Sequence, residues 1–132
     1  MNNDMKNIVY LIVFLVTSVT LQAQKKNNPE LLAPKAFSER MAKQPGQVVD
    51  VRTPREFKAG YIEGAFNIHL YDKDFEQRLE KLDKNKPVYV YCKVGGRSAE
   101  AVQVMQQKGF KKIVELKGGM DAWSAAGLPV KQ

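Results

Sequence analysis

The chain has 132 residues, of which 44% are hydrophobic and 27% are charged, and its formal net charge is +7. This length suits one ordinary domain and is too short for two, and the composition is typical of a globular protein rather than a disordered one. The basic residues are spread along the chain with few aromatic residues among them. That pattern argues against a nucleic-acid-binding protein and fits a small anionic substrate better.

The first 23 residues have the pattern of a secretory signal peptide. Lys6 places a positive charge near the N-terminus, an uncharged apolar run covers residues 8–16, and Ala23 offers a cleavage site. The apolar run is shorter than the roughly 20 residues that cross a bilayer. We therefore expect export to the periplasm or the exterior, followed by a flexible leader over residues 24–33. The alternative is an uncleaved segment that keeps the protein in contact with the membrane.

From residue 34 onward, helical and strand-like patterns alternate. Apolar spacing and flanking Pro and Gly residues predict helices at 34–43, 54–59, 72–82, 97–108 and 120–126, and strands at 48–51, 65–69, 88–91 and 113–116. Parallel strands need crossover connections, which are usually helical. The alternation therefore predicts a small three-layer α/β domain over residues 34–130, with a central parallel sheet flanked by helices.

Cys92 is the only cysteine, so it forms no disulfide within its own chain. In an exported protein such a cysteine is accidental, an intermolecular link or a working thiol. It follows a predicted strand and precedes Gly95, Gly96 and a predicted helix, an arrangement in which backbone N–H groups converge on an anion. Lys93 and Arg97 add positive charge, which favours the thiolate. We predict that Cys92 is a nucleophile rather than a small buried hydrophobic residue.

The segment that starts at Cys92, Cys-Lys-Val-Gly-Gly-Arg-Ser, resembles the active-site loop of rhodanese-like sulfurtransferases. Two other segments resemble motifs of that family in the same order. Residues 50–68 contain Asp-Val-Arg, Glu-Phe, Gly-Ala and Asn-Ile at the family's spacing, and residues 116–130 contain Gly-Gly, Ala-Trp and Ala-Gly-Leu-Pro-Val. Tyr61 stands where the family usually has a histidine, which we interpret as a mainly structural position.

The resemblance implies a persulfide relay. Cys92 would take the outer sulfur of thiosulfate, or of a similar small anionic donor, and pass it to a thiophilic acceptor such as cyanide or a protein dithiol. Arg97 would orient the loop, and Lys93 would face the incoming donor. The expected substrate-binding residues are those of the loop, Lys93, Val94, Gly95, Gly96, Arg97 and Ser98. No cofactor is implied.

Two other functions fit the same loop. Cysteine-dependent phosphatases of this fold resemble each other in a Cys-x5-Arg loop, whereas Cys92 and Arg97 are separated by one residue fewer, which suits a single sulfur atom better than a phosphate. The second is a sulfur carrier, or a redox-sensing module, that serves one protein partner without turnover. Turnover with free thiosulfate would distinguish an enzyme from such a carrier.

Several charged residues precede the loop in the sequence. Asp50, Arg52 and Glu56 are expected to form an ion-pair network that braces the turn beneath the loop, in a supporting rather than a catalytic role. His69 ends a predicted strand and so lies at the same edge as Cys92. A catalytic role for it is an alternative to a surface or core position. One Cys and one His do not make a metal site, so no metal is expected.

Overall fold

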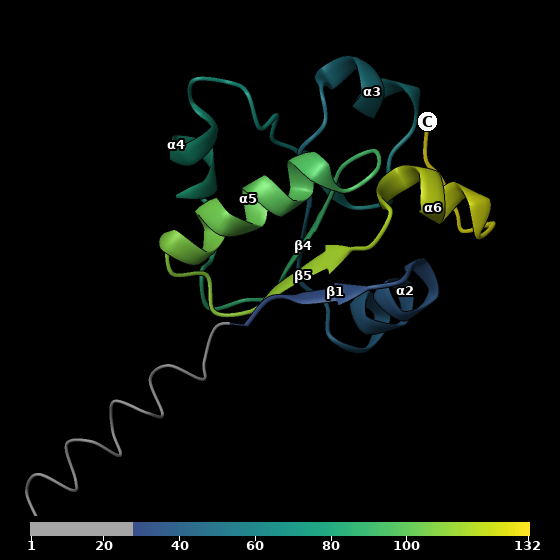
Figure 1. Cartoon of the computed structure of the whole chain (residues 1–132), viewed down its shortest axis with the longest axis horizontal. Helices are drawn as coiled ribbons and strands as arrows, with labels where there is room; N and C mark the ends of the chain where they lie inside the picture. Colours follow the sequence, from purple (N-terminus) through teal and green to yellow (C-terminus); the bar gives the residue numbers. More distant parts are fainter. Residues whose placement is uncertain (1–27) are drawn as a thin grey trace, which may run out of the picture.

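The computed structural model describes residues 28–132, and the predicted signal peptide lies outside this part (Figure 1). The described residues form strands and helices in alternation. These are β1 (Glu30–Leu32), α2 (Pro34–Lys43), β2 (Gln47–Asp50), α3 (Pro54–Ala59), β3 (Ala65–Asn67), α4 (Phe75–Leu79), β4 (Val88–Tyr91), α5 (Gly96–Gln107), β5 (Ile113–Leu116) and α6 (Gly119–Ala125). None of the helices in this part is long and apolar enough to cross a membrane.

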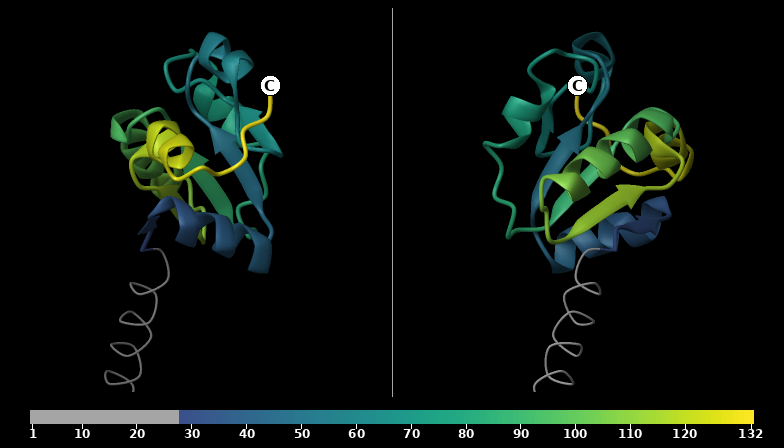
Figure 2. Two further views of the ribbon diagram at one scale, coloured as in Figure 1. Left: turned by 90° about the vertical axis from the view of Figure 1, so that its right-hand side faces the viewer. Right: turned by 60° about the vertical axis from the view of Figure 1, so that its left-hand side comes forward.

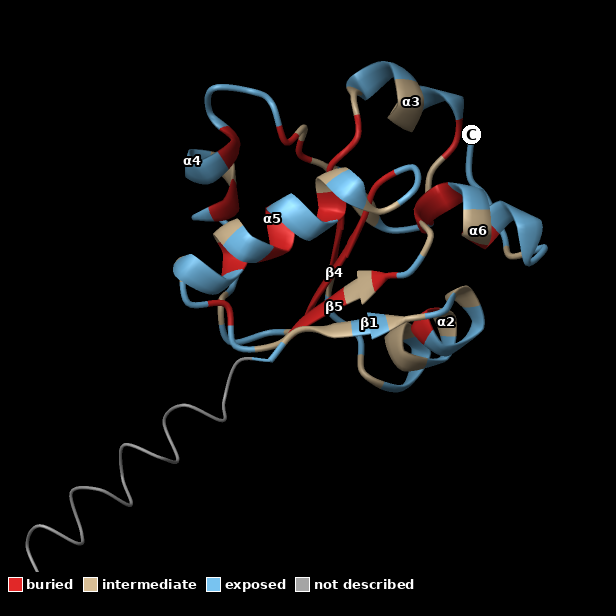
Figure 3. Ribbon diagram, viewed as in Figure 1, coloured by how far each residue is buried: buried red, intermediate tan, exposed pale blue. Residues whose placement is uncertain are grey.

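The strands form one parallel sheet in the order β1-β5-β4-β2-β3. Side chains of the central strand β4 alternate between the two faces. Val88 and Val90 pack with α4 and α5, whereas Tyr89 and Tyr91 pack with α2 and α6. Figure 2 shows the helices from the sides, and Figure 3 shows β4 fully buried among them. The predicted three-layer α/β fold is confirmed.

The residues at the start of α3 explain why that helix begins where it does. Thr53 is the N-cap and Pro54 the first helical residue, as the sequence predicts. The Thr53 hydroxyl accepts a hydrogen bond from the Glu56 N–H, and the Glu56 carboxylate accepts one from the Thr53 N–H. This capping box satisfies backbone donors that a helix N-terminus leaves free. It also fixes the position of the Glu56 side chain.

The structure corrects the expected leader. Residues 30–32, assigned to that flexible segment, form β1 at the edge of the sheet, with Glu30 in register with Val114 and Leu32 with Leu116. The Glu30 carboxylate also pairs with Arg40 at 2.9 Å. Three residues are too few to show an alternating pattern, and Leu31 of this strand is exposed. The strand is stabilised by its partners rather than by its own sequence.

Two elements are shorter than predicted. The helix expected over 72–82 is regular only from Phe75 to Leu79. Beyond it, Leu82 donates its N–H to the carbonyl of Leu79, a tighter spacing than that of an α-helix. The strand expected over 65–69 ends at Asn67, although Ile68 N–H still bonds to the Asp50 carbonyl.

Tyr61 keeps a structural position. Its ring stacks on Phe57 with centroids 4.4 Å apart, and its backbone forms an antiparallel bridge with Lys131. The last residues of the chain thus run back beside the turn that follows α3. The aromatic ring takes part in packing at the place where the family usually has a histidine.

Candidate active site

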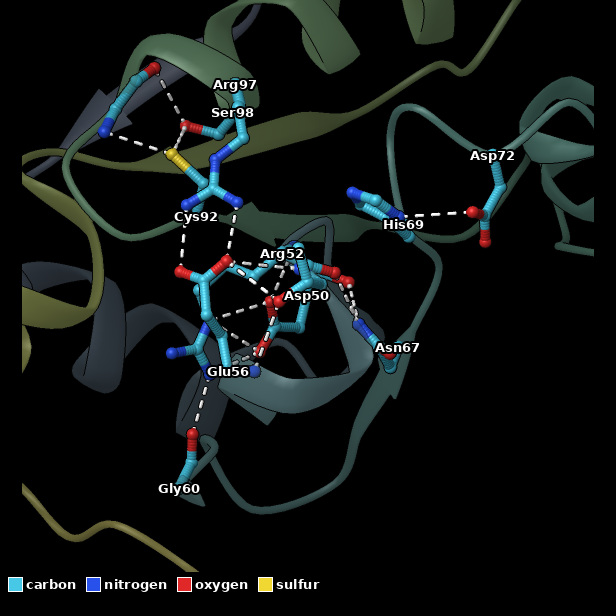
Figure 4. A network of polar contacts seen from close by, with 12 residues as sticks. Asp50, Arg52, Glu56, Gly60, Asn67, His69, Asp72, Cys92, Arg97 and Ser98 are labelled. Carbon is cyan, nitrogen blue, oxygen red and sulfur yellow. Dashed lines mark hydrogen bonds and ion pairs between the residues drawn. The ribbon is translucent and has the colours of Figure 1, made fainter. Parts of the chain in front are cut away.

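The candidate site lies at the carboxyl edge of the sheet. Cys92 directly follows β4, and the loop from Cys92 to Gly95 leads into α5. Asp50, at the end of β2, is in register with Tyr91, so its side chain is placed beside the start of the loop. Ligands of parallel α/β sheets bind at this edge. Figure 4 shows the side chains that gather there.

The sulfur of Cys92 is held by backbone and hydroxyl contacts. Gly95 donates its N–H to Sγ at 3.0 Å, and the Ser98 hydroxyl lies 3.4 Å from Sγ. Cys92 as a whole is only 1% exposed. Gly95 has a φ of 126°, which L side chains rarely adopt, and this conformation turns its N–H toward the sulfur. The turn predicted from the paired glycines is therefore present, and it directs one donor at Sγ.

Ser98 links the sulfur to a carboxylate that the sequence analysis missed. Its Oγ lies 2.7 Å from Glu115 Oε2 and 3.1 Å from the Gly95 carbonyl. Burial raises the pKa of Glu115, and the hydrogen bond from Ser98 opposes that rise. A glutamate inside the otherwise apolar strand β5 was the available signal, since a charged side chain in such a strand needs a partner.

Arg97 forms a bidentate pair with Glu56, at 2.7 Å and 2.9 Å. The hydrogen bond from Arg97 lowers the pKa of Glu56 to about 2, against the opposing effect of burial. The same bond raises the pKa of Arg97. The pair joins the first turn of α5 to α3, as Figure 4 shows. Arg97 therefore holds the loop in place, and Glu56 is its partner rather than a third member of the Asp50–Arg52 pair.

Asp50 and Arg52 form a buried ion pair beneath the loop. Arg52 Nη2 lies 2.7 Å from Asp50 Oδ2 and also donates to the Gly60 carbonyl at 2.6 Å. The guanidinium lies over the ring of Tyr91. Burial lowers the pKa of Arg52, but the bonds to Asp50 outweigh it and the net direction is upward. These contacts fit the supporting role expected of both residues.

Lys93 and Val94 form the exposed part of the loop. The Val94 side chain is 64% exposed, and Lys93 Nζ forms an ion pair with Asp121 Oδ2 at 2.7 Å. Asp121 belongs to α6, and the sequence analysis missed it because nothing local relates it to a residue 28 positions earlier. Lys93 was expected to face the donor, and in the structure its exposed ammonium pairs with a carboxylate.

The N-terminal turn of α6 packs directly on the loop backbone. Met120 N–H donates to the Cys92 carbonyl at 2.8 Å, and Asp121 N–H to the Lys93 carbonyl at 3.0 Å. Gly119 permits this approach, since a Cβ at that position would lie 2.5 Å from the Cys92 and Lys93 carbonyl oxygens. The Gly-Gly turn before the last helix is therefore part of the site's support.

His69 lies at the same edge, with contacts of its own. Its Nδ1 is 3.1 Å from Asp72 Oδ1, its ring packs edge-on against Tyr71, and its Nε2 is buried without a hydrogen-bond partner. In Figure 4 it stands apart from the cluster of Cys92, Arg97 and Ser98. Within residues 28–132, no group of three His, Cys, Asp or Glu side chains is placed to hold a metal ion.

Comparison with known proteins finds matches over most of the chain. The model of the rhodanese-like domain matches residues 33–126. A sulfurtransferase of Allochromatium vinosum is 34% identical over 83 residues, which cover 63% of this chain and 76% of that protein. A thiosulfate sulfurtransferase of Vibrio cholerae is 31% identical over 91 residues, which cover 69% and 84%.

A solved structure shares the fold. The crystal structure of a rhodanese-related protein from Thermoplasma volcanium superposes with a TM-score of 0.69 at 30% identity, covering 77% of this chain and 97% of that one. The residues that the family model matches include the loop after β4, α3 with its Glu56, and all of α6. The chain therefore belongs to the rhodanese-like domain family, and proteins named sulfurtransferases are among its relatives.

Proposed function

We propose that the protein moves sulfane sulfur from thiosulfate, or a similar small anionic donor, to a thiophilic acceptor through a persulfide on Cys92. The observation that carries this proposal is the loop itself, in which the Gly95 N–H points at Sγ from 3.0 Å at the start of α5. A backbone donor and a helix N-terminus stabilise negative charge on sulfur. The relatives named sulfurtransferases support the same reaction class.

Both half-reactions are displacements at sulfur. The Cys92 thiolate attacks the outer sulfur of thiosulfate, a new S–S bond forms, and the bond to the sulfonate sulfur breaks so that sulfite leaves with the electron pair. Cys92 then carries a persulfide anion. Cyanide attacks the terminal sulfur, thiocyanate leaves, and the thiolate returns. Charge balances in each step, and no oxidant or reductant is consumed.

The loop residues have separate roles in this scheme. Gly95 and the following backbone of Gly96 and Arg97 would hold the persulfide anion at the start of α5. Arg97 keeps the loop in position through Glu56. Ser98, within 3.4 Å of Sγ, limits the space beside the sulfur. These assignments give Cys92 and the residues from Gly95 to Ser98 a place in binding or support.

A protein acceptor is the second candidate. Val94 at the tip of the loop and Tyr71 after β3 are each 64% exposed, the highest values among the large hydrophobic residues that the structure leaves exposed. Exposed apolar residues beside a reactive group fit contact with another protein, such as a dithiol acceptor. In that case the protein acts as a carrier for one partner and turns over poorly with cyanide.

The deciding experiment measures thiocyanate formed from thiosulfate and cyanide by residues 24–132 and by the Cys92→Ser variant. We expect the wild type to form thiocyanate with turnover and the Cys92→Ser variant to form none. Mass spectrometry after thiosulfate alone should show a gain of one sulfur that a reductant removes. A folded wild type that gains this sulfur without turnover would favour the carrier, and one that gains none would refute the proposed function.

We also propose that the protein works outside the cytoplasm. This rests on the pattern of the first 23 residues, which lie outside the described part. Expression of the full chain in a Gram-negative host, followed by mass analysis of the periplasmic protein, should give a form that begins at Gln24. Recovery of only the full-length chain in the membrane fraction would favour the uncleaved anchor, and recovery in the cytoplasm would refute export.

A further inference from the structure

Every basic side chain on the loop or directly beneath it is engaged by a carboxylate. Arg97 pairs with Glu56 and Arg52 with Asp50, in both cases through contacts of 2.7 Å. Both arginine pairs are more than two-thirds buried and fix the backbone around the loop. The positive charge that the sequence predicts for this site is therefore largely compensated.

The third ion pair, between Lys93 and Asp121, differs from the two arginine pairs in its exposure to solvent. Lys93 and Asp121 meet at 2.7 Å with side chains 55% and 53% exposed. A pair this exposed contributes little to stability. It lies on the segment that immediately follows Cys92, where an incoming donor approaches. We therefore expect this pair to change the electrostatic potential near an incoming donor rather than the stability of the fold.

The backbone holds Asp121 in this position. Its N–H donates to the Lys93 carbonyl, and its neighbour Met120 donates to the Cys92 carbonyl. Gly119, which admits no Cβ, lets the chain come this close. The carboxylate is thus carried by a segment bonded directly to the loop, so it stays near Cys92 whichever way its side chain turns.

We propose that Asp121 is a positioning residue that draws the Lys93 ammonium toward α6 and so lowers the preference of the site for doubly charged donors. The inference rests on the proposed function and deepens it by naming the donor class. Coulomb energy scales with the charge of the donor, so a dianion such as thiosulfate is penalised about twice as much as a monoanionic persulfide or polysulfide end. Donors of the second class are favoured by comparison.

The first test compares wild type with Asp121→Asn at low ionic strength. We expect kcat/KM for thiosulfate to rise about two- to fivefold, and kcat/KM for the monoanion cyanide to rise by no more than the square root of that factor. The gain should shrink as salt is added. Asp121→Glu keeps the carboxylate and should behave as wild type.

A matched control removes one exposed carboxylate elsewhere. Glu80 pairs with Lys84 at 2.9 Å and with Lys108, which follows α5 at the end away from the loop. Glu80→Gln changes the net charge by the same amount and should leave kcat/KM for thiosulfate unchanged. Equal gains in both variants, or no gain in Asp121→Asn, would overturn the role proposed for Asp121.

A second test does not depend on sulfur transfer. Cys92 is the only cysteine, so its alkylation rates by anionic iodoacetate and by neutral iodoacetamide can each be measured directly. Their ratio reports the charge near Sγ and should rise about 1.5- to 2-fold in Asp121→Asn. A wild type that gains no sulfur from thiosulfate would refute the proposed function, whereas an unchanged alkylation ratio would refute the role of Asp121.

Discussion

At the scale of single residues, Cys92 combines near-complete burial with an exposed neighbour. Its side chain contacts the Gly95 N–H and the Ser98 hydroxyl, while the next two side chains in the sequence face solvent. A second sulfur atom bound to Cys92 would place the reactive end about one S–S bond length beyond Sγ.

The Gly119→Ala variant tests whether the loop depends on the close approach of α6 to its backbone. The added Cβ would lie 2.5 Å from two carbonyl oxygens of the loop, and φ there is 60°. We expect a roughly ten- to a hundredfold loss of sulfur transfer, because a shift of about 1 Å at a reacting group has effects of this size. Turnover and circular-dichroism melting are the measurements.

Gly127→Ala is the matched control for Gly119→Ala. Its φ is 72°, so alanine is strained there as well, but no other atom lies within 4 Å of the added Cβ. The Gly127→Ala variant should lose about 1–2 kcal/mol of stability, as alanine usually does in this conformation, and should keep its turnover. Equal turnover losses in the two variants would contradict the importance of the close approach.

At the scale of elements, the Glu56–Arg97 pair joins α3 to α5. No side chain of α3 is buried, so this helix is attached to the site by its cap and its ion pair rather than by a core face. The pair therefore connects the placement of α3 with the geometry of the loop. An element attached in this way should respond to pH earlier than the sheet does.

The pH dependence of stability tests this connection. Arg97 lowers the pKa of Glu56 to about 2, from an ordinary value of 4.5. A depressed carboxyl pKa gives stability that is present above the ordinary value and is lost as pH falls from about 5 toward 2. Glu56→Gln should be about 1–2 kcal/mol less stable than wild type at pH 7, and the difference should close over that window.

Urea unfolding at pH 7, 5, 4 and 3 measures the difference. Glu39→Gln, which removes an exposed carboxylate from α2, controls for the loss of one surface charge. If the difference in unfolding free energy between Glu56→Gln and wild type stays constant down to pH 3, the Glu56–Arg97 pair is not the source of that difference.

The elements that carry strong local signals were predictable. Thr53 and Pro54 mark the start of α3, and the apolar run before Cys92 marks β4. The loop was recognisable because its glycines, arginine and cysteine are contiguous. The partners of the loop were not, since Glu115 and Asp121 reach it through tertiary packing from β5 and α6. Local patterns give the position of a nucleophile more readily than the charges that surround it.

At the scale of the whole molecule, the first strand closes one edge of the sheet. β1 covers β5, and Lys117 N–H bonds to the Leu32 carbonyl at 2.8 Å. Without it, a row of backbone groups beside apolar β5 side chains would be open to pairing with another chain. The segment expected to be a leader in the sequence analysis therefore protects the fold.

Truncation tests the contribution of β1. A protein of residues 34–132 should melt about 5–10 °C below one of residues 28–132 and aggregate more readily, because it lacks three paired residues and the Glu30–Arg40 ion pair. Calorimetry and light scattering measure the two effects. Arg40→Gln in the longer protein separates the ion pair from the strand and should account for only a small part of the change. Identical melting of the two lengths would show that β1 adds nothing.

The way in which α6 holds the loop has a consequence for protein engineering. The bonds from Met120 and Asp121 go to the carbonyls of Cys92 and Lys93, so they depend on backbone atoms that every amino acid supplies. The side chains at positions 93 and 94 are exposed and do not build this frame. Substitutions at these two positions should therefore leave the backbone geometry around the sulfur unchanged. A combinatorial library at both positions can be screened for new donors and acceptors.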